Sequence, residues 1–148
     1  MQPSQFFSKE QMANIVLAIR EAERNTSGEI RVHIDRYCRG DVLDRAAYVF
    51  EKLHMHRTKL RNGVLFYLAI EDRKFAVLGD AGINAVTPGN FWDEIKSVMA
   101  GSFSENDFAG GLVRAVSMAG SQLKEHFPWQ ADDMNEISDD ISFGDKQE

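Results

Sequence analysis

Three short segments of the sequence combine carboxylates or amides with glycines, a combination that can bind a hard cation. They are Ser27-Gly28-Glu29, Arg61-Asn62-Gly63 and Gly79-Asp80-Ala81-Gly82. Carboxylate and carbonyl oxygens are the ligands that Ca²⁺ and Mg²⁺ prefer, and glycine lets the backbone come close to a ligand. Asp107, at the start of a predicted helix, would join them if that helix packs over the same edge.

The hydrophobic pattern predicts the elements that would position these segments. Apolar residues at helical spacing predict a helix from Ser8 to about Ala22, and alternation predicts a half-buried strand over residues 30–35. Gly40-Asp41 opens a second helix. The continuous apolar run Val64–Ile70 is typical of a central strand covered on both faces. A polar turn leads from it into a third strand over residues 75–78.

The rest of the chain predicts mainly helices. A short strand is expected over Ile83–Val86. A helix would begin at Thr87-Pro88, because threonine can cap it and proline suits the first helical position. Ser104 and Asp107 would cap a long last helix that runs to about His126.

This order of elements predicts an α/β fold, a three-layer sandwich with a mixed central sheet of mostly short strands and helices on both faces. A strand–helix–strand unit crosses over right-handed with its strands parallel, and the third strand would return antiparallel. The entries to the first two strands and the exit of the third then meet at one edge of the sheet. All three glycine-containing segments are expected at this edge.

Charge divides the chain into two parts. The whole sequence has 17 Lys+Arg and 23 Asp+Glu, a formal net charge of −6. Seven of the acids and one base follow residue 128, which leaves 16 acids and 16 bases before it. We therefore predict a single charge-balanced domain over residues 1–128, with no attraction to nucleic acid, and an acidic, flexible tail over residues 129–148.

Cysteine content and hydropathy exclude further classes of protein. A single cysteine excludes an intramolecular disulfide framework and a cysteine-based zinc site. No apolar run approaches the roughly 18 residues that a membrane span needs, and the N-terminus resembles no secretory signal. The sequence thus predicts a soluble, cytoplasmic protein without a membrane span, and we expect it to be a monomer.

Each carboxylate also has an ordinary structural explanation, and this alternative stays open. Glu29 can end a strand, Asp80 can form a turn before Gly82, and Asp107 can stabilise a helix start through the helix dipole. The sequence has no cysteine, histidine or aspartyl phosphatase motif and no Walker-type glycine loop.

An ordered set of segments resembles the TPM domain family, which includes a thylakoid-lumen acid phosphatase linked to photosystem II repair. The resemblance runs from about Phe6 to Phe127. The segments are Ser8-x-Glu10, Ala22-Glu23-x-x-Thr26-Ser27-Gly28-Glu29-Ile30, Arg61-Asn62-Gly63-Val64-Leu65, Gly79-Asp80-x-Gly82-Ile83 and Asp107-Phe108-x-Gly110-x-Leu112. The resemblance implies an α/β sandwich, binding of a divalent cation, chiefly calcium, and a phosphatase activity in some members.

The resemblance also implies residue roles. It assigns Glu29, Asp80 and Asp107 as metal ligands, with Ca²⁺ or alternatively Mg²⁺ as the cofactor. Many members have an acid where this chain has Arg61, and many have an export signal and a C-terminal membrane anchor, neither of which is seen here. Apart from the resemblance, the residue types themselves would allow Arg61 and Asn62 to stabilise negative charge on a phosphoryl group.

Three functional hypotheses follow from the sequence. The first is a domain that binds a divalent cation and serves a regulatory or partner-binding role. The second is a metal-dependent phosphomonoesterase of the acid phosphatase type, in which the metal would polarise the phosphoryl group. The third is a metal-free protein-interaction module. No catalytic residue is assigned at this point.

Overall fold

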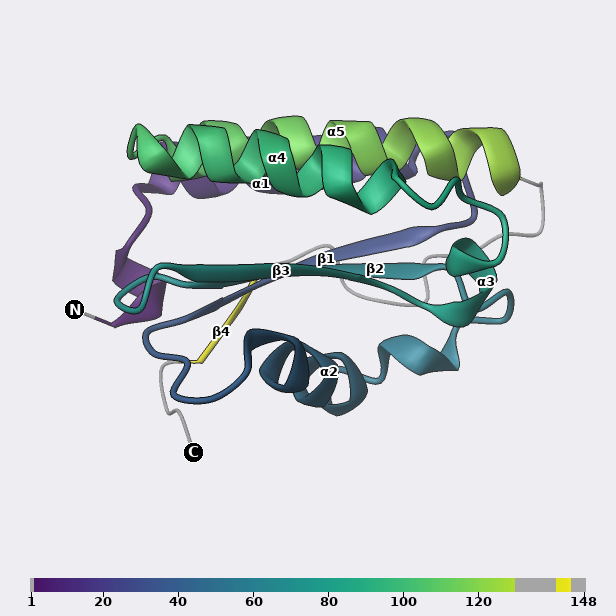
Figure 1. Cartoon of the computed structure of the whole chain (residues 1–148). Coiled ribbons are helices and arrows are strands. Elements are labelled where there is room, and N and C mark those ends of the chain that lie inside the picture. Colours follow the sequence, from purple (N-terminus) through teal and green to yellow (C-terminus); the bar gives the residue numbers. More distant parts are fainter. Residues whose placement is uncertain (1, 130–140, 145–148) are drawn as a thin grey trace.

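A computed structural model describes residues 2–129 and 141–144 and has three layers (Figure 1). A four-stranded sheet lies between helices α1, α4 and α5 on one face and helix α2 on the other. The α/β sandwich with helices on both faces is therefore confirmed. The main elements are α1 Lys9–Glu23, β1 Glu29–Asp35, α2 Val42–Lys52, β2 Gly63–Ala69, β3 Lys74–Gly79, α3 Ala81–Asn84, α4 Phe91–Ser104, α5 Phe108–His126 and β4 Ser142–Phe143, with 3-10 turns η1 Pro3–Gln5 and η2 Met55–Arg57.

The strand order is β3-β2-β1-β4. Strands β1 and β2 pair in parallel from Glu29 opposite Gly63 to Asp35 opposite Ala69. Strand β3 pairs with β2 antiparallel. The predicted crossover over α2 and the predicted hairpin are both correct, so the entries to β1 and β2 and the exit of β3 share one end of the sheet.

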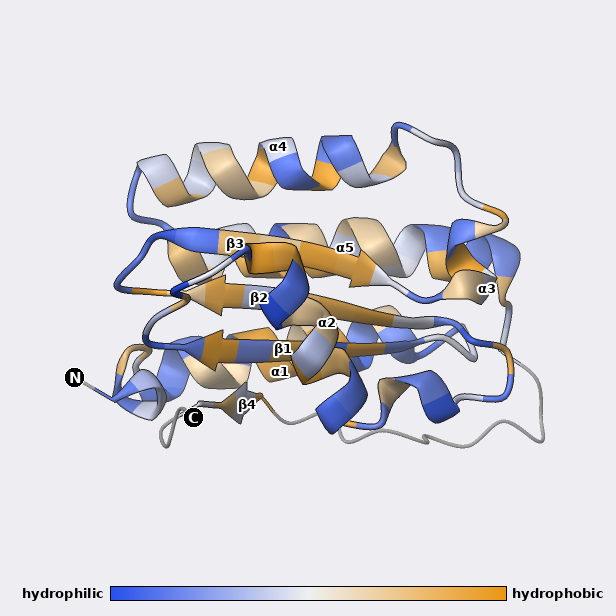
Figure 2. Cartoon of the chain, turned by 60° about the horizontal axis from the view of Figure 1, so that its bottom comes forward, coloured by the Kyte–Doolittle hydropathy of each residue, from blue (hydrophilic) through white to orange (hydrophobic). Residues whose placement is uncertain are grey.

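Strand β2 separates two hydrophobic cores. Every residue of β2 is buried, as its continuous apolar sequence predicts. Alternate residues of β2, among them Phe66, pack into the main core with α1, α4 and α5. The residues between them, among them Tyr67, pack into a smaller core with α2. Figure 2 shows the apolar strands from the α2 side.

Three local predictions are wrong. Ser104 does not cap α5, because it is the last residue of α4 and its hydroxyl donates to the carbonyl of Gly101 at 2.8 Å. Ile83–Val86 is not a strand, since residues 81–84 form helix α3, whose N-cap Asp80 accepts a hydrogen bond from the amide of Ala81. Thr87 does not start α4. Its hydroxyl donates to the carbonyl of Ile83 at 3.0 Å, so Thr87 closes the preceding turn, and α4 begins at Phe91.

Part of the predicted flexible tail belongs to the sheet. Ser142 and Phe143 form β4 and pair in parallel with His33 and Ile34 of β1. The physical reason is burial of apolar side chains, since Ile141 and Phe143 pack against the main core. Residues 130–140 and 145–148 of the predicted tail lie outside the described residues.

The described part of the chain has no helix that combines the length and hydropathy required to cross a membrane.

Candidate functional site

The structure brings together the three glycine-containing segments at one end of the sheet, here called the amino-end edge. The amide of Glu29 donates to the carbonyl of Asn62 at 3.3 Å, and the amide of Asp80 donates to the carbonyl of Gly63 at 3.0 Å. The backbone amides of Glu29 and Asp80 are therefore hydrogen-bonded to the carbonyls of two consecutive residues, Asn62 and Gly63. The amide of Gly82 completes the edge by donating to the carbonyl of Arg61 at 2.8 Å.

Three polar residues of the amino-end edge are buried. The exposed fractions are 1% for Asn62, 2% for Glu29 and 8% for Asp80. The side-chain amide of Asn62 donates to the hydroxyl of Ser27 at 3.2 Å, and its backbone amide donates to the hydroxyl of Thr58 at 3.2 Å. Two buried acids beside a buried amide are the part of the sequence prediction that the fold reproduces.

Arg61 already compensates the charge of Asp80. Its Nε and Nη2 donate to the two carboxylate oxygens at 2.7 and 2.9 Å, a bidentate geometry that is strong and directional. The carboxylate also accepts from the amide of Ala81 at 2.7 Å. The hydrogen bond from Arg61 to Asp80 raises the pKa of the arginine. A cation that binds Asp80 must therefore compete with the guanidinium group.

The glycines of this edge serve close packing. A methyl group at Gly82 would lie 2.0 Å from the carbonyl oxygen of Leu60. A methyl group at Gly79 would lie 2.4 Å from the ring of Trp92, and one at Gly28 would lie 2.5 Å from Leu123. These contacts, and not the approach of an ion, explain why the three positions are glycine.

Asp107 lies at the other end of the sheet and does not join the group. It caps α5 by accepting from the amide of Gly110 at 3.1 Å, and its neighbour Asn106 accepts from Arg73 of the β2–β3 turn at 3.3 Å. The C-terminal end of α5 reaches the amino-end edge, where Thr26 donates to the carbonyl of Leu123. A 19-residue helix spans about 28 Å, so its first residue cannot be at the same edge.

Beside Asp80 the surface has a hollow of about 370 Å³, lined in part by Glu51, His56, Arg61 and Asp80. Within residues 2–129 and 141–144, no three histidine, cysteine or acidic side chains are grouped so as to hold a metal ion. Of the predicted ligands at this edge, Asp80 lines the hollow, whereas Glu29 is not among its lining residues.

Comparison with known proteins agrees with this architecture. The TPM domain matches residues 1–122. The chain belongs to the TPM domain family. No curated protein matches the sequence.

Solved structures share the fold of this TPM domain. The NMR structure of the BA42 protein from the psychrophilic bacterium Bizionia argentinensis has 46% identity and a TM-score of 0.87, over 93% of this chain and 95% of that chain. The N-terminal domain of the cg2496 protein from Corynebacterium glutamicum has 18% identity and a TM-score of 0.64, over 80% and 74% of the two chains. An N-terminal domain of a P. gingivalis protein has 18% identity and a TM-score of 0.67, over 86% and 84%.

At the carboxyl end of β1 the TPM domain contains a buried polar network centred on Asp35. Its fully buried carboxylate accepts from Tyr67 Oη at 2.6 Å and from Arg45 Nε at 2.8 Å. His33 Nε2 lies 2.8 Å from the same carboxylate. Burial alone would raise the pKa of Asp35, but the hydrogen bonds from His33, Arg45 and Tyr67 lower it to about 2. Burial and the hydrogen bond to Asp35 raise the pKa of Tyr67.

This network fastens β4 to the sheet. Ser142 Oγ lies 2.7 Å from His33 Nδ1, which forms a hydrogen-bonded line Ser142–His33–Asp35. Such a line resembles a nucleophile triad, yet Asp35 is already neutralised by Arg45, and Ser142 also donates to the carbonyl of Val32 at 3.3 Å. We therefore interpret the line as structural.

A second hollow lies next to this network and was not predicted from the sequence. It has a volume of about 720 Å³, is here called the carboxyl-end pocket, and is lined mainly by the loop of residues 36–41 with Arg45 and Gly144. The available signal was the sequence Arg36-Tyr37-Cys38-Arg39 directly after a parallel strand. Ligands of open α/β sheets bind outside the carboxyl ends of the strands.

Proposed function

We propose that this TPM domain binds a divalent cation, Ca²⁺ in preference to Mg²⁺, at the amino-end edge, and that the cation controls binding of a protein partner. The observation that supports the proposal is the attachment of Glu29 and Asp80 to the consecutive carbonyls of Asn62 and Gly63. Two buried acids are thereby held at one place by the backbone. Membership of the TPM domain family supports the same proposal.

The ion pair between Arg61 and Asp80 gives the cation its regulatory effect. The side chain of Arg61 is 52% exposed, and that of Asp80 is 7% exposed. A cation that takes over the carboxylate of Asp80 releases the guanidinium group to the surface, where it can bind an acidic partner. The cation affinity is weak, because binding must first displace a bidentate hydrogen-bonded pair.

A calcium titration followed by amide NMR shifts tests the proposal. The amides of residues 27–29, 61–63 and 79–82 should shift saturably with CaCl₂ and less with MgCl₂. NaCl at equal ionic strength corrects for screening, and Asp80→Asn, which keeps an N-cap residue, is the matched control. Equal responses in the wild type and Asp80→Asn would rule out this site.

The phosphomonoesterase hypothesis uses the same edge, and a second arm of the experiment separates it. A generic aryl phosphate is added with Ca²⁺, Mg²⁺ or no divalent cation. Cation-dependent turnover that disappears in Asp80→Asn would favour the esterase. Cation binding without turnover favours the regulatory role. If neither cation binding nor turnover is observed, the metal-free interaction module is the remaining hypothesis.

A further inference from the structure

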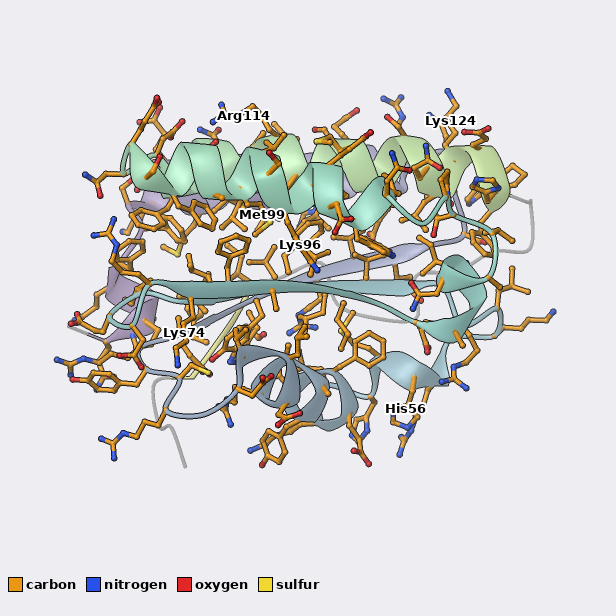
Figure 3. The ribbon with its side chains drawn as sticks, in the orientation of Figure 1. His56, Lys74, Lys96, Met99, Arg114 and Lys124 are labelled. Carbon is orange, nitrogen blue, oxygen red and sulfur yellow. The ribbon has the colours of Figure 1, made fainter. Side chains whose placement is uncertain are left out.

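The loop over residues 36–41 is held rigidly at the carboxyl end of β1. Lys74 Nζ donates to the carbonyls of Cys38 and Gly40 at 2.9 and 3.1 Å. The carboxylate of Asp72 accepts from the amide of Cys38 at 2.7 Å. Figure 3 shows Lys74 at this end of the sheet, away from His56 at the other. Side chains of this loop are therefore presented from a fixed backbone.

Two guanidinium groups of the loop share one aromatic ring. The guanidinium carbon of Arg36 lies 5.0 Å from the ring centre of Tyr37, and that of Arg39 lies 5.8 Å from the same centre. Both distances are those of cation–π contacts. Arg36, Tyr37 and Arg39 all line the carboxyl-end pocket, so two positive charges lie at its surface.

The charges of Arg36 and Arg39 are not compensated by ion pairs in the part of the chain that the structure describes. Arg45, the third arginine of the pocket, is paired with Asp35. The carboxylate of Asp41 is turned to its own helix, where it accepts from the amides of Leu43 and Asp44. The Nε of Arg36 is buried without a hydrogen-bond partner among the described residues.

The position of the pocket is the usual one for a ligand. Strand β1 lies between β2 and β4 and is parallel to both, and the pocket lies beyond its carboxyl end, as expected for open α/β sheets. A volume of about 720 Å³ is that of a site for a small organic molecule and not only for a bare ion.

We propose that the carboxyl-end pocket binds a small organic molecule through an oxyanion group that Arg36 and Arg39 hold. The planar guanidinium fork suits both carboxylate and phosphate oxygens, so the shared chemistry is a negatively charged oxyanion. The exposed carboxylate of Asp44 on the rim favours a ligand with a hydroxyl or amine at its other end. This site is independent of the amino-end edge, and the proposal does not rest on the proposed cation binding.

Titration of the full chain with oxyanions, followed by amide NMR shifts, tests this proposal. The probes are inorganic phosphate, citrate and glycerol phosphate, with NaCl at matched ionic strength as the reference for screening. We expect saturable shifts confined to residues 36–41. Stronger binding of glycerol phosphate than of citrate identifies a phosphate group, and the reverse order identifies a carboxylate.

Variants decide whether the two arginines form the site. Arg36→Gln with Arg39→Gln should weaken binding by about tenfold or more, since each lost hydrogen bond to a charged group is worth about one such factor. Arg57 is an exposed residue of η2 at the other end of the sheet, and Arg57→Gln should leave the affinity unchanged. If the double variant does not fold, Arg39→Gln alone is titrated, and it too should weaken oxyanion binding. Shifts equal to those in NaCl, or shifts that survive in the arginine variants, would overturn the proposal.

Discussion

The guanidinium of Arg61 binds both carboxylate oxygens of Asp80, with Nε at 2.7 Å and Nη2 at 2.9 Å. Arg61 adopts a left-handed backbone conformation with φ of 53°, which is uncommon for a residue with a side chain. The pair joins the turn before β2 to the end of β3. The guanidinium group of Arg61 therefore already binds the carboxylate at which the cation is proposed to bind.

Removal of that charge should strengthen cation binding. Arg61→Gln keeps a long polar side chain but leaves the carboxylate of Asp80 without its bidentate partner. We expect the calcium affinity to rise by about tenfold, since a charge-assisted pair no longer competes. Isothermal titration calorimetry measures this, with Arg57→Gln as the control for net charge. An unchanged affinity would place the cation away from Asp80.

The network around Asp35 should be essential for stability. Asp35→Asn removes the charge at nearly constant volume and leaves Arg45, 21% exposed, without its partner. Loss of one member of a buried ion pair costs about 3 to 5 kcal/mol. The free energy of unfolding in urea should fall by that amount. The exposed Asp44→Asn should cost no more than about 1 kcal/mol, the contribution of an acid in the first turn of a helix.

Asp35 should also make the domain sensitive to acid. Its pKa is about 2 in the folded protein against an ordinary 3.8. A lowered folded-state pKa contributes stability above the ordinary value, and this contribution is lost as the pH falls towards the folded-state value, because the unfolded chain takes up the proton first.

The expected window is therefore from about pH 4 down to about pH 2. Urea midpoints measured across it should decline more steeply for the wild type than for Asp35→Asn. A hydrogen bond from Arg114 also lowers the pKa of Asp107, so Asp107→Asn measures how much of the decline comes from that residue. Parallel curves for the wild type and Asp35→Asn would contradict the assignment.

Two glycines should respond to alanine with opposite signs. Gly82→Ala would place a methyl group 2.0 Å from the carbonyl oxygen of Leu60, a rigid backbone atom, and should destabilise the fold by about 2 kcal/mol or more, as overpacking does. Gly101 lies inside α4, and apart from its chain neighbours and the backbone of its own helix no atom lies within 4 Å of such a methyl group. Gly101→Ala should stabilise the protein by about 0.5 to 1 kcal/mol. Thermal unfolding measures both changes, and stabilisation by Gly82→Ala would contradict the packing described at this edge.

The amino-end edge was predictable because its geometry follows from neighbouring elements. A right-handed crossover and a short hairpin determine where Glu29 and Asp80 lie relative to each other. The position of Asp107 was not predictable in this way, since it depends on the direction in which α5 crosses the sheet. That direction is determined by packing between helices, for instance Gly120 against Ala22.

The Asp35 network was not predictable from the pattern of the strand. In β1, His33 and Asp35 alternate with apolar residues, which suggests a face exposed to solvent. Arg45 of α2 binds Asp35, and Ser142 of β4 binds His33, so both side chains are buried. Strand β4 itself has only two residues, and periodicity cannot identify so short a strand.

Strand β4 also bears on how the protein is made. Ser142 binds His33 across 109 residues of sequence, so a ribosome must pass residue 142 before this pairing can form. Until then the carboxyl half of β1 is an open sheet edge, and open edges promote association between chains. The nascent domain is therefore protected from self-association at this edge only after residues 142 and 143 have been synthesised and have paired with β1.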